Sequence, residues 1–207
     1  MTVTILIIIV TCLISYKGFN DRSFFEKLKH HPVSEANNGE WYRMVSSGFL
    51  HADWFHLGIN MYVLYEFGSL VERLYLDQFG DVAGRGIYLL LYLVMIILAD
   101  IPSFIKHKNN RYYGAIGASG AVSGILFIFI LFLPWAELRL YFAIPIPAII
   151  FGVLYLAYSS WASKKAKDNI GHDAHFYGAL AGMALTIILI PRTLGVFIDQ
   201  FINGLPF

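Results

Sequence analysis

Six long runs of apolar residues dominate this chain, and they restrict its fold more than any other feature. Several of them approach the roughly 20 residues that a helix needs to cross a bilayer. Hydrophobic residues make up 57% of the chain and charged residues only 14%, a balance far from that of soluble domains. Because lipid offers the backbone no hydrogen bonds, such runs must form helices. We therefore predict an all-α membrane protein.

The predicted architecture is a single membrane domain spanning residues 1–207, built as a bundle of six transmembrane helices. The predicted helices cover residues 3–16, 54–74, 86–105, 117–135, 141–161 and 175–190.

Two connections between these helices stand out. Residues 17–50 form the one long loop, in which the stretch 24–29 has the mixed character of a helix lying at the membrane interface. Residues 163–172 are polar and punctuated by glycine, which is typical of a mobile loop. A net charge of +1 gives no reason to expect a nucleic-acid partner, and the single cysteine, Cys12, excludes an intramolecular disulfide.

Polar residues capable of chemistry gather where alternate predicted helices begin. His51, His56 and Asn60 accompany the second helix, Ser119 the fourth and His175 the sixth. Helices of even number run in the same direction across the bilayer, so these residues share one side of the membrane. The positive ends of three helix dipoles meet there, which favours developing negative charge.

Glycine pairs indicate which helices pack closely. Gly120 and Gly124 in the fourth helix, and Gly178 and Gly182 in the sixth, have the small-xxx-small spacing that lets membrane helices approach. His175 lies three residues before Gly178 and therefore on the same face. The neighbouring position of Ser119 and Gly120 does not fix the direction of the serine.

These residue types suit nucleophilic catalysis. A serine hydroxyl needs a neighbouring base to accept its proton, and His175 is the candidate. A tetrahedral oxyanion needs preorganised donors. His56 and Asn60, spaced i and i+4 on one face, could supply them beside the backbone N–H of Ser119. No acidic residue is obviously placed to orient His175, which favours a dyad over a triad.

Four segments together resemble the motifs of the rhomboid family of intramembrane serine proteases, in order and in spacing. They are residues 42–43 (Tyr-Arg), 51–61 (HADWFHLGINM), 117–120 (GASG) and 175–182 (HFYGALAG). The resemblance implies a six-helix core that cleaves transmembrane or membrane-associated polypeptides without a metal or an organic cofactor. It also implies a multi-pass protein of the plasma membrane with its active site near the extracytoplasmic side.

The resemblance further implies a role for each matching residue. Ser119 would be the nucleophile and His175 the general base, while His56, Asn60 and the Ser119 amide would form the oxyanion hole. Supporting roles fall to His51, Arg43, Gly117, Gly120, Gly178 and Gly182. Beyond the matching residues, we hypothesise that a substrate enters past the fifth helix, with the 163–172 loop as a lid and with part of an aromatic gate formed by Phe151, Tyr155, Tyr158 and Trp161.

The chain departs from the family pattern at two positions. Tyr42 stands beside Arg43 where many rhomboids have tryptophan. Ser123 stands four residues after the serine, where many have an aromatic residue that supports the histidine ring. The second departure puts ring stacking on His175 in doubt.

Other functions remain open from the residues alone. A transporter would use the acidic residues Glu66, Glu72 and Asp100 near membrane depth. These residues also have structural explanations: Glu72 could pair with Arg73 at one helix end, and Asp100 could mark the end of another helix. A noncatalytic adaptor would need neither Ser119 nor His175. A metal site is the weakest alternative, because no His-Glu-x-x-His signature occurs; its ligands would be His51, His56, His172, Asp173 and His175.

Charge also argues against the implied orientation. With a cytoplasmic N-terminus, the segments outside the membrane would carry 11 of the 15 lysines and arginines. The positive-inside rule favours the opposite arrangement.

Overall fold

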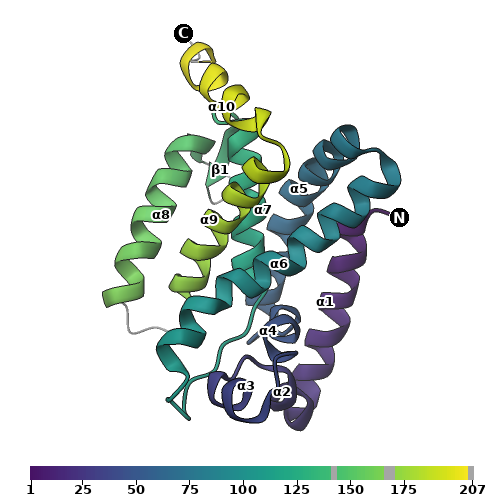
Figure 1. Ribbon diagram of the computed structural model, residues 1–207, viewed down its shortest axis with the longest axis vertical. Helices are drawn as coiled ribbons and strands as arrows, with labels where there is room; N and C mark the ends of the chain where they lie inside the picture. Colours follow the sequence, from purple (N-terminus) through teal and green to yellow (C-terminus); the bar gives the residue numbers. More distant parts are fainter. Residues whose placement is uncertain (141–143, 166–170, 205–207) are drawn as a thin grey trace.

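Helices make up most of the structure, a computed structural model that describes residues 1–140, 144–165 and 171–204. In Figure 1, α7 and α9 lie between α8 on one side and α1, α5 and α6 on the other, with α2, α3 and α4 together at one end. The helices of the first half are α1 (Val3–Asn20), α2 (Arg22–Leu28), α3 (Pro32–Asn38), α4 (Arg43–Ser46), the 3₁₀ turn η1 (Ser47–Phe49), α5 (Trp54–Phe79) and α6 (Asp81–His107). The second half contains α7 (Ser119–Phe132), the strands β1 (Glu137–Leu140) and β2 (Ile144–Pro147), α8 (Ala148–Lys165), α9 (His172–Leu189) and α10 (Arg192–Asn203).

Each of the six predicted apolar runs overlaps one long helix: α1, α5, α6, α7, α8 or α9. By length and composition, α1 and α6 can each cross a membrane, and α9 with α10 could form a third, broken span bent by 113°. The other long helices are shorter or more polar; α7 has only 14 residues. The number of six transmembrane helices therefore stays a prediction. Helix α10 was not predicted, and it begins directly after Pro191.

The all-α prediction is wrong in one segment. Residues 137–140 and 144–147 form an antiparallel hairpin in which Glu137 lies opposite Pro147 and Leu140 opposite Ile144. The predicted helix 141–161 begins only at Ala148, and its residues 141–143 lie outside the described part. Pro145 and Pro147 explain the difference, because proline lacks the N–H that a helix interior needs.

Residues 17–50 do not form one long loop, although the helix expected over residues 24–29 is present as α2. The segment contains α2, α3, α4 and η1, and α1 itself extends to Asn20. Local signals account for these helices. The Asp21 side chain caps α2 by accepting a hydrogen bond from the Phe24 N–H at 3.0 Å. His31 caps α3, and Pro32 occupies its first turn, a position that tolerates proline.

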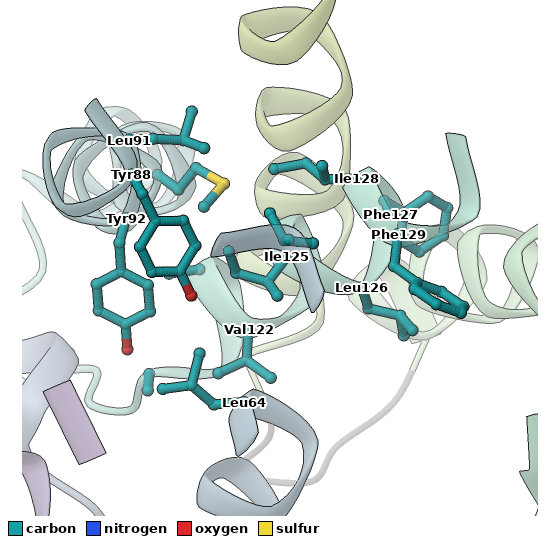
Figure 2. Close-up of a cluster of buried hydrophobic side chains, with 14 of the residues drawn as sticks. Leu64, Tyr88, Leu91, Tyr92, Val122, Ile125, Leu126, Phe127, Ile128 and Phe129 are labelled. Carbon is teal, nitrogen blue, oxygen red and sulfur yellow. The ribbon is translucent and has the colours of Figure 1, made fainter. Parts of the chain in front are cut away.

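Helix α7 forms the centre of the core. All its residues from Gly120 to Leu131 are buried, as expected of a helix that is apolar all round. Figure 2 shows Tyr88, Leu91 and Tyr92 of α6 on one side of the α7 side chains, with Phe127 and Phe129 pointing the other way.

Helices α7 and α9 touch through their glycines, as the spacing predicted. A Cβ atom at Gly178 would overlap the carbonyl of Gly120, and one at Gly182 would overlap the carbonyl of Gly124. Because the two contacts step in the same direction along both helices, α7 and α9 run parallel. The ends at which they begin therefore lie together.

A buried carboxylate fastens α1 to the rest of the bundle. Glu72 of α5 accepts hydrogen bonds from the backbone N–H groups of Val3 and Thr4, both at 2.8 Å, and from the Thr4 hydroxyl at 2.7 Å. Arg85 of α6 lies 3.5 Å away. The expected local pair of Glu72 with Arg73 is therefore wrong, since Glu72 instead binds amides that a helix start leaves unpaired.

Candidate active site

The starts of α5 and α7 meet at Gly117. Its backbone N–H donates to the carbonyl of Ser47 at 3.0 Å, and its φ of +123° is one that other residues rarely adopt. A Cβ atom placed there would lie 3.0 Å from Cε1 of His56 and 3.7 Å from Oγ of Ser119. Gly117 thus leaves room for both side chains, and the His56 ring and the Ser119 hydroxyl flank it.

The start of α9 reaches the same place. A Cβ atom at Gly120 would lie 3.3 Å from the carbonyl oxygen of Ala174 and 3.7 Å from its Cβ. Gly120 directly follows Ser119, and Ala174 directly precedes His175. The side chains of Ser119 and His175 are both partly exposed. The starts of α5, α7 and α9 therefore converge at one end of the bundle, as the common direction of these helices predicted.

Ser119 is the first residue of α7. Its backbone N–H is one of the amides that a helix leaves without an intrahelical acceptor, so it can serve an external anion. One turn later, Ser123 donates its hydroxyl to the Ser119 carbonyl at 2.7 Å. This bond secures the first turn of α7 at Ser119.

His56 and Asn60 occupy successive turns at the start of α5. Asp53 caps this helix by accepting from the His56 N–H at 2.8 Å. The buried Asn60 donates through Nδ2 to the His56 carbonyl at 2.9 Å. A carboxamide nitrogen carries two hydrogens, so one bond leaves Asn60 a second hydrogen to donate.

His51 lies fully buried three residues before the start of α5. Its ring packs edge-on against His56 with 4.9 Å between centroids. Ser15 gives its only proton to the Phe49 carbonyl at 2.9 Å, so Nδ1 of His51 must donate to Ser15 Oγ across 3.0 Å. Burial, and next the nearby His56, lower the pKa of His51 to about 3. His51 is therefore neutral and supports the His56 ring.

The contacts of Arg43 are with the end of α2 and with Glu40. Its Nη1 donates to the carbonyls of Glu26 at 2.7 Å and Lys29 at 3.1 Å, and its Nε pairs with Glu40 at 2.5 Å. The ring centroid of Tyr42 is 5.6 Å from the guanidinium. Arg43 thus closes the end of α2, and tyrosine fills the aromatic position beside it.

The His175 ring has an aromatic support that the sequence did not reveal. Tyr155 of α8 stacks on it, with centroids 6.0 Å apart and planes at 25°. His172 approaches edge-on at 6.0 Å. Tyr155 was expected only as a gate residue, and no sequence pattern links α8 to α9, so only the packing of the helices reveals this contact.

The four gate aromatics of α8 divide into two pairs. Tyr158 and Trp161 are 53% and 59% exposed, whereas Phe151 and Tyr155 pack against the core around α7. Residues 166–170 of the predicted lid lie outside the described part of the chain.

The alternative sites are less well assembled. Glu72 is occupied by the start of α1, and Asp100, inside α6 rather than at its end, accepts from the Ser47 hydroxyl at 3.1 Å. Glu66 is exposed on α5. Within residues 1–140, 144–165 and 171–204, no three His, Cys, Asp or Glu side chains are grouped so that they could hold a metal ion.

The structure is a helical bundle with Ser119 and His175 near the starts of two parallel helices that pack through glycines. This arrangement matches the class of helical membrane protein that the sequence motifs predicted. A model of the Rhomboid domain matches residues 38–192, so the chain belongs to the rhomboid family. It is 30% identical over 154 residues to RHOMBOID-like protein 12, mitochondrial, of Arabidopsis thaliana, covering 71% of this chain and 46% of that protein.

Two further relatives widen the comparison. Rhomboid-like protein 11, chloroplastic, of Arabidopsis thaliana is 30% identical over 164 residues, or 72% of this chain and 52% of that protein. Rhomboid protease GluP of Bacillus subtilis is 38% identical over 88 residues, or 42% of this chain and 15% of that protein. The chain spans about half the length of the two Arabidopsis relatives.

Proposed function

We propose that this chain is an intramembrane serine endopeptidase that cleaves transmembrane or membrane-associated polypeptides through a Ser119–His175 dyad. The observation that carries the proposal is the convergence at Gly117 and Gly120. His56 and Ser119 flank the first glycine, and the residue before His175 packs on the second. Three helix starts thus surround one partly exposed hydroxyl.

The reaction follows from these positions. The His175 imidazole takes the Ser119 proton as Oγ attacks a substrate carbonyl, and it returns that proton to the leaving amine. His56, the second Nδ2 hydrogen of Asn60 and the Ser119 N–H stabilise the oxyanion. Water then hydrolyses the acyl-enzyme. The substrate must be extended at the cut, because a helix hides its carbonyls in internal hydrogen bonds.

The membrane arrangement is part of the proposal. Six of the helices cross the bilayer, and the active site faces the extracytoplasmic side of the plasma membrane. Support for the crossing comes from the six apolar runs and from family membership. The names of two relatives contain the words mitochondrial and chloroplastic. An experiment must therefore identify the membrane in which this chain resides. Tags at both termini, probed in intact and permeabilised cells, report the location and orientation.

Labelling with a fluorophosphonate tests the chemistry. We expect detergent-purified wild-type protein to be labelled, and neither Ser119→Ala nor His175→Ala to be labelled above background. A membrane-anchored substrate should be cut only by the wild type. Equal labelling of wild type and Ser119→Ala would contradict the proposal. Binding of client proteins without any cleavage would favour an adaptor. Solute flux across liposome membranes that persists in Ser119→Ala would favour a transporter.

A further inference from the structure

Position 123 of α7 holds a hydroxyl where an aromatic ring was expected. Ser123 gives its only proton to the Ser119 carbonyl at 2.7 Å. The Tyr155 hydroxyl, 2.5 Å from Ser123 Oγ, must therefore be the donor of that second bond. The two bonds link the backbone of the nucleophile to a phenol on another helix, α8.

Packing fixes the Tyr155 ring on several sides. Phe127 of α7 and Phe151 of α8 each lie with centroids 5.8 Å from it. These separations fall in the range at which aromatic pairs attract one another. With its hydroxyl held by Ser123 and its ring held by two phenylalanines, Tyr155 presents a fixed face to His175.

We propose that Tyr155 is the positioning residue of His175, doing from α8 what a ring at position 123 would do from α7. The inference rests on the proposed dyad. A neutral imidazole has one acceptor nitrogen, so it can take the Ser119 proton only while its ring plane is held. The Tyr155 face, stacked at 25°, and the His172 edge, at 83°, restrict that plane from two directions.

The location of Tyr155 on α8 distinguishes it from a ring on α7. A ring at position 123 would move with the nucleophile, since both belong to one helix. Tyr155 reaches His175 only while α8 lies against α7 and α9. The alignment of the base therefore depends on the position of α8, and displacement of this helix carries the supporting ring away.

Four variants test the proposal, measured by the rate of fluorophosphonate labelling in detergent. Labelling needs no polypeptide substrate, so it reports activation of Ser119 apart from substrate docking. We expect Tyr155→Leu and Tyr155→Ala to label about tenfold or more slowly than wild type, since misorientation of a base is costly. Tyr155→Phe keeps the ring and should stay within about threefold. Ser123→Tyr combined with Tyr155→Ala restores a ring from α7 and should label faster than Tyr155→Ala alone.

The control is Leu154→Ala, since Leu154 is the neighbouring residue on α8 and is 58% exposed; it should label like wild type. Thermal unfolding of each variant separates loss of fold from loss of alignment. Wild-type rates in Tyr155→Leu would overturn the inference and leave the dyad standing. So would a folded double variant no faster than Tyr155→Ala. Absence of labelling in wild type would instead remove the proposed function itself.

Discussion

Gly117 combines an unusual backbone angle with contact to two proposed site residues, so a single methyl group tests its role. In Gly117→Ala the new Cβ would carry the strain of positive φ and would press on His56 at 3.0 Å. We expect the free energy of unfolding to fall by about 1 to 3 kcal/mol, and fluorophosphonate labelling to fall by about tenfold or more. Thermal unfolding and labelling rates measure the two effects.

Gly39 provides a matched control for this substitution. Its φ is +72°, and a Cβ atom there would meet nothing within 4 Å. Gly39→Ala should therefore show a loss of stability from backbone strain with labelling unchanged. If both variants lost labelling equally, the contact between residue 117 and His56 would have no special part in catalysis.

The buried ring of His51 predicts how stability depends on pH. Its pKa in the folded protein is about 3, below the roughly 6.5 of an unfolded histidine. Between these two pKa values the histidine is protonated in the unfolded chain and neutral in the folded protein. The contribution of His51 to the free energy of unfolding is therefore fully present above about pH 6.5. It decreases by about 1.4 kcal/mol for each pH unit as the pH falls from there toward 3.

Thermal unfolding in detergent between pH 7.5 and 5 checks this expectation. The variant His51→Gln cannot take up that proton, so its midpoint should fall less steeply with acid than that of the wild type. Parallel pH profiles for the two proteins would show that His51 does not resist protonation in the folded state.

At the scale of helices, the contact between α7 and α9 depends on the absence of side chains. In Gly178→Ala the Cβ atom would overlap the backbone of Gly120, and neither backbone can yield as a flexible side chain could. We expect a loss of about 1 to 3 kcal/mol together with slower labelling, because the helices that carry Ser119 and His175 are forced apart. Thermal unfolding and labelling report both.

Gly195 of α10 serves as the comparison, since a Cβ atom there meets nothing within 4 Å. Gly195→Ala should be neutral or up to about 1 kcal/mol more stable, because alanine favours a helix over glycine. Equal effects at positions 178 and 195 would mean that the close approach of α7 and α9 is unimportant.

The sequence predicted elements whose signal is local and missed those that depend on packing. Hydropathy located the long helices, and the small-xxx-small spacing of Gly120 with Gly124 and of Gly178 with Gly182 predicted the contact between α7 and α9. The apolar pattern of residues 141–161 does not reveal the hairpin, although Pro145 and Pro147 argue against a helix there. The helix expected over residues 24–29 is present as α2, whereas the sequence analysis did not predict α3, α4 and η1. The contact of Tyr155 with His175 joins separate helices, so no local pattern predicts it.

At the scale of the whole molecule, Glu72 connects three helices: α1, α5 and α6. In Glu72→Ala the amides of Val3 and Thr4 lose their acceptor inside the protein, at a cost of about 2 kcal/mol or more. We expect α1 to detach more often and its Cys12, the only cysteine of the chain, to react faster with N-ethylmaleimide. The rate of this reaction in detergent is the measurement.

Glu66→Ala is the appropriate control, since Glu66 is an exposed carboxylate on the same helix α5. It should leave the Cys12 reaction and the unfolding midpoint unchanged. If Cys12 reacted no faster in Glu72→Ala than in wild type, α1 would be held mainly by its apolar contacts.

The shortness of α7 has a consequence for the supply of water. A helix of 14 residues rises only about 21 Å, whereas the hydrocarbon layer is about 30 Å thick. If α7 crosses the bilayer as proposed and Phe132 lies at one surface, Ser119 at the opposite end of the helix lies below the other surface. Under the proposed function, hydrolysis at that depth would require a path for water from the membrane surface, and the depth of the membrane would determine which peptide bonds of a substrate can be cut.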